Sequence, residues 1–80
     1  MRLTLTASTG AKILVWHEGD TFHVCPADRA GEPEVCLGID LFEVIADLTG
    51  LDLEEGSQAA EALELSDRAQ RQLAPKQLEG

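Results

Sequence analysis

Hydrophobic residues recur at every second position early in the chain and at every third or fourth position after Gly38. A period of two is typical of strands with one buried face, whereas spacings of i, i+3, i+4 and i+7 are typical of helices packed on a core. The change of period predicts an α+β fold, in which an antiparallel sheet of three to four strands (residues 1–37) is followed by two helices (residues 38–80) packed on one face of the sheet.

The second expected strand is apolar on both of its faces. Residues 2–7, RLTLTA, alternate strictly, but residues 12–17, KILVWH, carry apolar side chains on either side. Two helices can cover only one face of so small a sheet, so Leu14 and Trp16 are expected to stay partly exposed on the other. Contiguous apolar surface on a small protein usually marks an interface. Leu14 and Trp16 are therefore the candidate apolar interface, either in a homodimer or with a partner protein.

Turn residues separate the remaining strands. Gly19 supplies the positive φ of a tight hairpin that leads into residues 21–25, TFHVC. Pro26 is expected to end that strand because it has no N–H to donate to the sheet. A short fourth strand is expected at residues 34–37, EVCL.

The first helix carries signals at both of its ends. Asp40 is expected to be its N-cap with Glu43 reaching back, and Ile39 is expected to pack on Val44 as a hydrophobic staple. Gly50 is the expected left-handed C-cap. The buried stripe of this helix is expected to consist of Leu41, Val44, Ile45 and Leu48.

A second helix is expected from Ser57 to about Ala74, where Pro75 stops it. Residues 75–80 after it are expected to fray. Its apolar side is thin and is expected to consist of Ala59, Ala62, Leu63, Ala69 and Leu73.

Length and charge limit the function. A chain of 80 residues that is 44% hydrophobic makes one small folded domain, expected to span residues 1–80, with little room for a deep active-site cleft. The net charge of −9 repels nucleic acid and anionic membranes and steers the molecule toward basic partners. The N-terminus lacks the apolar segment of a signal peptide, and no apolar run approaches the ~20 residues of a membrane span. We therefore expect a cytoplasmic protein that binds neither nucleic acid nor membranes directly.

The residues suited to catalysis or metal binding are scattered. His17, His23, Cys25 and Cys36 are the right residue types for a tetrahedral zinc site, but they lack the CxxC or HxxxH spacing of such sites. A cysteine nucleophile beside a histidine would still lack an orienting third group and an oxyanion hole. We expect no metal, no cofactor and no enzymatic activity, while the sequence leaves open whether Cys25 and Cys36 are bridged.

Acidic residues are segregated in the middle of the chain. Between Arg29 and Arg68 there are eleven Asp and Glu residues and no Lys or Arg. Neighbouring acids on one helix face lie ~5–6 Å apart at Cβ, a spacing comparable to that of phosphates along a nucleic-acid strand. Such a row can occupy a groove built for a phosphate backbone, although a charged helix face can also serve solubility alone. The candidate partner-binding residues are Asp40, Glu43, Asp47, Asp52, Glu54 and Glu55.

In length, acidity and α+β plan, the whole chain resembles the small acidic anti-CRISPR proteins of phages and other mobile elements, particularly inhibitors of type I Cascade complexes. The resemblance is one of size and charge and transfers no functional residue. It implies a non-enzymatic inhibitor that acts as a DNA mimic, because such complexes hold nucleic acid in positively charged channels. The alternative is an antitoxin-like or regulatory adaptor that binds its partner through apolar surface, and a small metalloenzyme is a third hypothesis.

Overall fold

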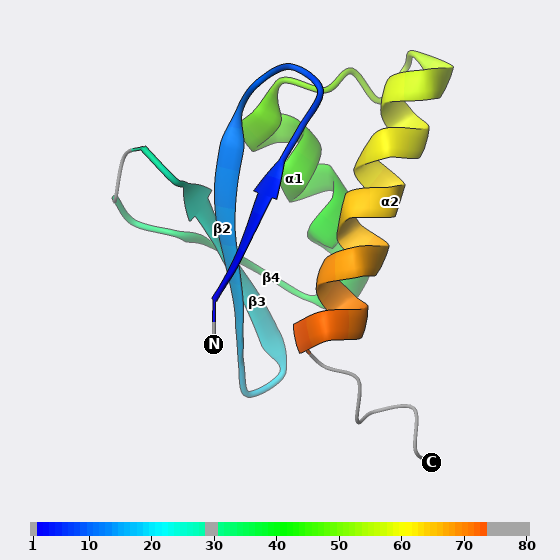
Figure 1. The fold of residues 1–80 in the computed structure, drawn as a ribbon. Coiled ribbons are helices and arrows are strands. Elements are labelled where there is room, and N and C mark those ends of the chain that lie inside the picture. The colour runs from blue at the N-terminus through cyan, green and yellow to red at the C-terminus, as the bar shows by residue number, and fades with distance from the viewer. Residues whose placement is uncertain (1, 29–30, 74–80) are drawn as a thin grey trace.

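In the described part of the chain, four antiparallel strands are followed by two helices, in the order that the hydrophobic pattern predicts (Figure 1). The computed structural model describes residues 2–28 and 31–73. Its elements are β1 (Leu3–Thr6), β2 (Lys12–Glu18), β3 (Thr21–Pro26), β4 (Glu34–Cys36), a 3-10 turn η1 (Gly38–Asp40), α1 (Leu41–Thr49) and α2 (Gly56–Leu73).

Each strand pairs with its neighbour in the chain, which gives the sheet order β1-β2-β3-β4. Val15 of β2 lies opposite Leu3 on one side and Val24 on the other, so these three side chains share one face. The hairpin between β2 and β3 turns at Gly19, where φ is 60°. Pro26 is the last residue of β3, as predicted.

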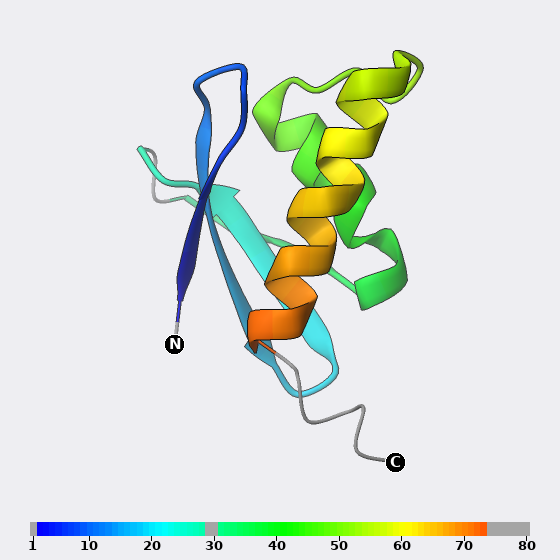
Figure 2. The same cartoon turned by 45° about the vertical axis from the view of Figure 1, so that its right-hand side comes forward.

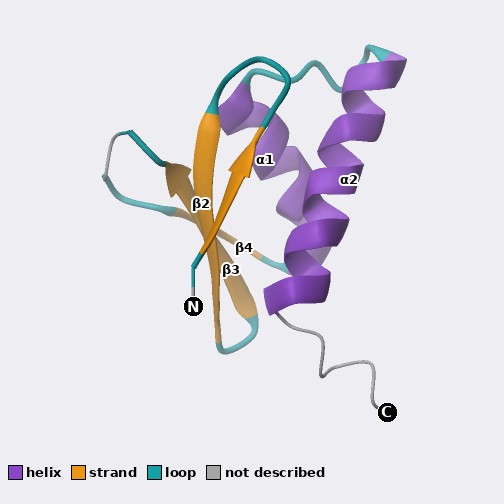
Figure 3. Ribbon diagram, viewed as in Figure 1, coloured by secondary structure: helices purple, strands orange, loops and turns teal. Residues whose placement is uncertain are grey.

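Both helices lie on the same side of the sheet, and neither of these described helices covers the opposite face (Figures 2 and 3). This arrangement confirms the predicted α+β architecture. The helix-covered face of β2 and β3 carries the most deeply buried strand residues, since Ile13, Val15 and Val24 are 0% exposed. The largest fully buried side chains are Ile13, Leu41, Ile45, Val15 and Val24.

Asp40 occupies the N-cap position of α1, as predicted, but the predicted side-chain cap and hydrophobic staple do not form. Asp40 is the last residue of η1, with φ −100° and ψ 0°, and its side chain makes no capping hydrogen bond. The preceding 3-10 turn explains the difference, because a helical backbone at Asp40 leaves its carboxylate without the extended geometry of an N-cap. Ile39 is 78% exposed instead of forming the staple. The C-cap is confirmed, since Gly50 has φ 80° and its N–H donates to the carbonyl of Ala46 at 2.9 Å.

The buried side of α2 agrees with the predicted one except at Leu63. The helix buries Ala62, Leu65, Ser66 and Ala69, whereas Leu63 is 53% exposed. The buried four follow the spacing i, i+3, i+4 and i+7, and the predicted set combined this stripe with a residue from the next face. Ala74 and residues 75–80 lie outside the described residues.

Candidate functional site

An acidic groove lies beside α1 and the loop that leads from α1 to α2. Four of the six predicted partner-binding carboxylates line it, and apolar side chains contribute the rest of its wall. Its volume is about 340 Å³, and its lining residues are Glu43, Asp47, Asp52, Glu54, Ala46, Leu51 and Leu53. We refer to it below as the acidic groove.

The core of the protein fixes the direction of the two helical carboxylates. Leu41 and Ile45 are buried on one side of α1, so Glu43 and Asp47, one turn apart, face solvent on the other. The predicted exposure of Glu43 and Asp47 is therefore confirmed.

Local hydrogen bonds hold the backbone of the loop that carries Asp52 and Glu54. The backbone N–H of Asp52 donates to Oε1 of Gln58 at 2.8 Å, and Oδ1 of Asp52 accepts from the backbone N–H of Glu54 at 2.9 Å. Asp52 therefore shapes the loop with one oxygen, while Glu54 is exposed beside it.

The other two predicted residues lie outside the acidic groove. Asp40 is at the opposite end of α1. Glu55 caps α2, because its Oε1 accepts from the backbone N–H of Gln58 at 2.9 Å and from the hydroxyl of Ser57 at 2.7 Å. These hydrogen bonds, that from Ser57 first, hold the pKa of Glu55 below its ordinary value. Gln58 lies three positions after Glu55, which is the spacing of a capping box and could have indicated this structural role.

Sequence reasoning also missed the role of Glu61. Its Oε2 accepts from the backbone N–H of Ser8 and its Oε1 from the Ser8 hydroxyl, both at 2.6 Å and across 53 positions of sequence. The two bonds tie α2 to the turn between β1 and β2. Glu61 is therefore a structural carboxylate, and no short-range pattern in the sequence could have shown its partner.

Replacing Glu61 by glutamine is expected to lower the melting temperature in a pH-dependent way. The hydrogen bonds from the Ser8 side chain, first, and then from its backbone depress the pKa of Glu61. A depressed folded-state pKa contributes stability that is present above the ordinary glutamate pKa and is lost as the pH falls below it. The difference in melting temperature from the unchanged protein should therefore be largest near pH 7 and shrink in acid. A difference that is equal at pH 7 and pH 3 would contradict the role of the ionised carboxylate.

The acidic groove can bind a cationic side chain. None of the Lys and Arg residues in the described part of the chain lines it, so its four carboxylates have no internal counter-ion there. The stem of an incoming arginine or lysine can pack mainly on the partly exposed Leu53, since Ala46 and Leu51 are buried, while its charged end reaches the carboxylates. This combination of an apolar wall and carboxylates suits a basic protein surface.

The candidate zinc ligands are separated by the sheet. His17 pairs with Phe22, and Phe22 pairs with Cys36, so His17 and Cys36 are on the helix-covered face. The alternation of β3 puts His23 and Cys25 on the opposite face. Within residues 2–28 and 31–73, no three His, Cys, Asp or Glu side chains are placed to hold a metal ion, and both cysteines are free thiols.

The thiol of Cys36 is expected to react slowly with a disulfide reagent at neutral pH. Burial raises its pKa, and the charges of Asp40 and then Glu34 raise it further, so less of the reactive thiolate is present. Replacing Asp40 by asparagine should lower this pKa and speed the reaction, measured in a Cys25→Ser background by absorbance against pH. An unchanged rate profile would contradict the influence of Asp40 on this thiol.

The predicted apolar interface on the uncovered sheet face contains a stacked row of side chains. The ring of Trp16 stacks on that of His23, with centroids 5.5 Å apart and planes at 13°, and the guanidinium carbon of Arg2 lies 4.5 Å from the centroid of the Trp16 ring. Nε2 of His23 is also 3.6 Å from Oε1 of Glu18. Leu14 and Trp16 are both half-buried. The face is thus mixed in polarity, and its cross-strand stacking was not predicted.

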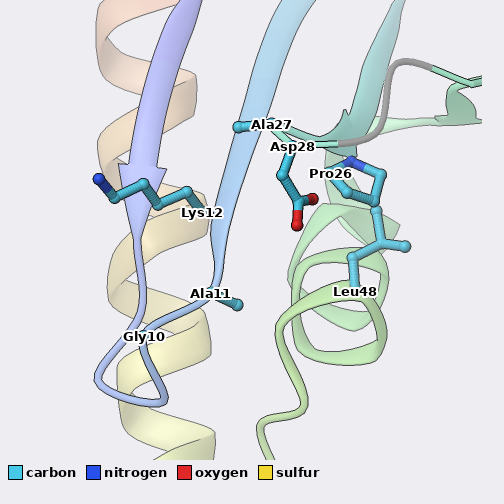
Figure 4. A pocket seen from close by; sticks show the side chains of 7 residues that line it. All are labelled: Gly10, Ala11, Lys12, Pro26, Ala27, Asp28 and Leu48. Atoms are coloured by element: carbon cyan, nitrogen blue, oxygen red, sulfur yellow. The ribbon is translucent and has the colours of Figure 1, made fainter.

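A larger groove of about 530 Å³ lies where the β1–β2 turn meets the end of β3 (Figure 4). The carboxylate of Asp28 points into it, Leu48 forms part of its wall, and the amine of Lys12 extends away from Asp28. The rest of the groove wall consists of Gly10, Ala11, Ala27 and Pro26. A single carboxylate without a second acid, base or nucleophile offers no catalytic arrangement.

Comparison with protein-family models, with curated proteins and with solved structures gives no match for this chain. Neither described helix combines the length and the apolar character that crossing a membrane requires.

Proposed function

We propose that the protein is a non-enzymatic inhibitor that binds a basic nucleic-acid-binding protein and blocks the access of nucleic acid. The observation that carries this proposal is the acidic groove, which Glu43, Asp47, Asp52 and Glu54 line and to which no Lys or Arg of residues 2–28 and 31–73 contributes. Arginine and lysine residues that normally contact phosphates would contact these carboxylates instead.

The proposed target is a crRNA-guided surveillance complex of the type I Cascade class in the cytoplasm of a bacterial cell. Its nucleic-acid channel is positively charged, and a molecule of net charge −9 is attracted to such a channel over several ångströms. Inhibition by occupation of the channel needs no cofactor, metal or catalytic residue.

The test measures binding of target DNA by purified type I Cascade complexes in the presence of increasing amounts of the protein. We expect stoichiometric loss of DNA binding and a stable complex between the protein and a Cascade subunit. DNA binding that is unaffected by saturating protein, with no complex on size-exclusion chromatography, would contradict the proposed target.

A second candidate function is an antitoxin-like or regulatory adaptor whose charge serves solubility. The uncovered sheet face with Leu14 and Trp16 favours it, and a homodimer would use the same face. In that case Trp16→Ala would abolish partner binding, whereas changes in the acidic groove would leave it intact.

A further inference from the structure

Two strongly exposed apolar side chains, including the most exposed one of the described residues, lie away from the predicted interface on the sheet. Ile39 is 78% exposed and Leu63 53%. The two line one groove of about 300 Å³ between η1, the start of α1 and the outer side of α2. The residues that line it are Gly38, Ile39, Phe42, Leu63, Ser66, Asp67 and Gln70. We refer to it below as the apolar groove.

Hydrogen bonds from one side chain hold the two sides of the apolar groove together. Nε2 of Gln70 donates to the carbonyl of Gly38 at 3.0 Å and to the hydroxyl of Ser66 at 3.1 Å. A Cβ atom on Gly38 would lie only 3.2 Å from Oε1 of Gln70, so the absence of a side chain there permits this close approach. The apolar groove is therefore already formed in the isolated chain, which limits the entropy that a ligand must remove.

The apolar groove and the acidic groove adjoin along one side of α1. Ile39 and Phe42 line the first, and Glu43 and Ala46 line the second. Residues three or four positions apart share a helix face. The four residues that line the two grooves here follow this spacing, so they form one continuous stripe: Ile39, Phe42, Glu43 and Ala46. Seven residues of helix rise about 10 Å, so an apolar end and an acidic end are separated by about two turns.

Charge decides which molecule can cover this surface. Asp40 is exposed between Ile39 and the first turn of α1, and Glu43 follows it. Asp67 also lines the apolar groove, although Oδ2 of Asp67 is 2.8 Å from a guanidinium nitrogen of Arg71. A second copy would bring its own net charge of −9 against this acidic rim. The complementary occupant has an apolar anchor and positive charge.

We propose that the paired grooves dock a basic amphipathic helix of the partner protein, with an apolar side chain against Ile39, Phe42 and Leu63 and a lysine or arginine two turns away in the acidic groove. The inference rests on the proposed function, because it specifies which segment of a basic partner is recognised. An amphipathic helix in a groove is a common mode of peptide recognition, and its anchors recur at i and i+7. The apolar anchor supplies affinity that salt does not screen.

The probe is a fluorescein-labelled, alanine-based helical peptide of about 16 residues with leucine and arginine seven positions apart, measured by fluorescence anisotropy. A control peptide carries alanine in place of the leucine. The protein variant combines Ile39→Thr with Leu63→Gln, and both positions are exposed enough for the fold to persist. Its matched control is Val35→Thr in β4, which removes an apolar side chain of similar exposure, 55%, outside both grooves.

We expect the groove variant to bind the leucine peptide about tenfold more weakly, the Val35→Thr control to bind normally, and the alanine peptide to bind weakly to every form. No binding of the leucine peptide, equal binding of both peptides, or normal binding by the groove variant would overturn the docking proposal. The oligomeric state of the free protein is a further test, measured by sedimentation. If the protein is a dimer and the variant with Ile39→Thr and Leu63→Gln is a monomer, the apolar groove binds a second copy. That result would also overturn the docking proposal.

The charge variants Glu43→Gln and Asp47→Asn separate this inference from the proposed function. If these two variants weaken Cascade binding but the apolar variant does not, the acidic inhibitor stands and the helix-docking inference fails. If only the apolar variant weakens Cascade binding, the proposed inhibition through the acidic groove is contradicted, while binding of an apolar side chain in the apolar groove is supported.

Discussion

Replacing Glu43 and Asp47 together by lysine will abolish binding of the basic partner while the melting temperature stays nearly unchanged. Each reversal removes an attraction and adds a repulsion in the acidic groove, so we expect affinity to fall about a hundredfold or more. Stability is spared because both side chains are exposed. Glu43 lies in the first turn of α1 and Asp47 near its end, so the helix dipole disfavours one lysine and favours the other.

The matched control is Glu18→Lys with Asp20→Lys on the β2–β3 hairpin, which is exposed and belongs to the sheet. Each replacement adds two positive charges, so both double variants change the net charge from −9 to −5. Calorimetric titration against the captured partner at two salt concentrations compares the affinities of the two double variants. Affinity of the unchanged protein should also fall as the Debye length shrinks from about 10 Å at 0.1 M salt to about 3 Å at 1 M. Binding that survives the groove reversal and ignores salt would eliminate nucleic-acid mimicry and favour the adaptor.

Replacing Ile45 by aspartate will lower the free energy of unfolding by several kcal/mol. Ile45 is 0% exposed at the centre of α1, and a carboxylate there would be buried without a partner. A chain of this length has a total stability of only about 4–12 kcal/mol, at ~0.05–0.15 kcal/mol per residue. We therefore expect a largely unfolded population at 37 °C, measured by urea unfolding followed by circular dichroism.

Two conservative changes control for this prediction. Ile45→Val removes one methylene and should lower the free energy of unfolding by only about 0.5–1.5 kcal/mol. Asp47→Asn, two residues along on the exposed side, should stay within about 0.5 kcal/mol. Similar melting temperatures for Ile45→Asp and Asp47→Asn would show that the buried and exposed faces of α1 are wrongly assigned.

The sequence predicted those parts of the fold that depend on periodicity and on backbone geometry. Hydrophobic residues alternate around Val15 and follow helical spacing around Ile45, because each segment buries one face. The order of strands and helices follows from these two patterns. Gly19 and Gly50 have positive φ, which few other residues adopt, and their places in the chain indicated a hairpin and a helix end. These signals are local and need no knowledge of distant partners.

Features that depend on distant contacts could not be predicted in the same way. The choice between Leu63 and Leu65 depends on how α2 is rotated against α1, and a thin apolar stripe rich in alanine leaves that rotation open. Likewise η1 forms where Gly38 approaches Gln70, a contact across 32 positions. Asp40 is the N-cap of α1 as predicted, but it also ends η1, and its helical backbone leaves the carboxylate without a capping hydrogen bond.

The candidate site was predicted only in part, because a carboxylate looks the same in sequence whether it is free or engaged. The exposed stripe of α1 correctly placed Glu43 and Asp47 in solvent. Glu55 and Glu61 belong to the same acidic segment, yet one caps a helix and the other binds Ser8. The apolar groove was missed because Ile39 and Leu63 were both assigned to the interior.

Because every strand pairs only with the strand next to it in the chain, the sheet can assemble through short loops that close at little entropic cost. The packing of α2 against β1 and β2 is different, since it joins the last described element to the first two. Formation of this contact must wait until α2 has been synthesised. A nascent or truncated chain that ends before Gly56 would keep its hairpins but leave part of the apolar side of β1 and β2 open to solvent, in a state prone to aggregation.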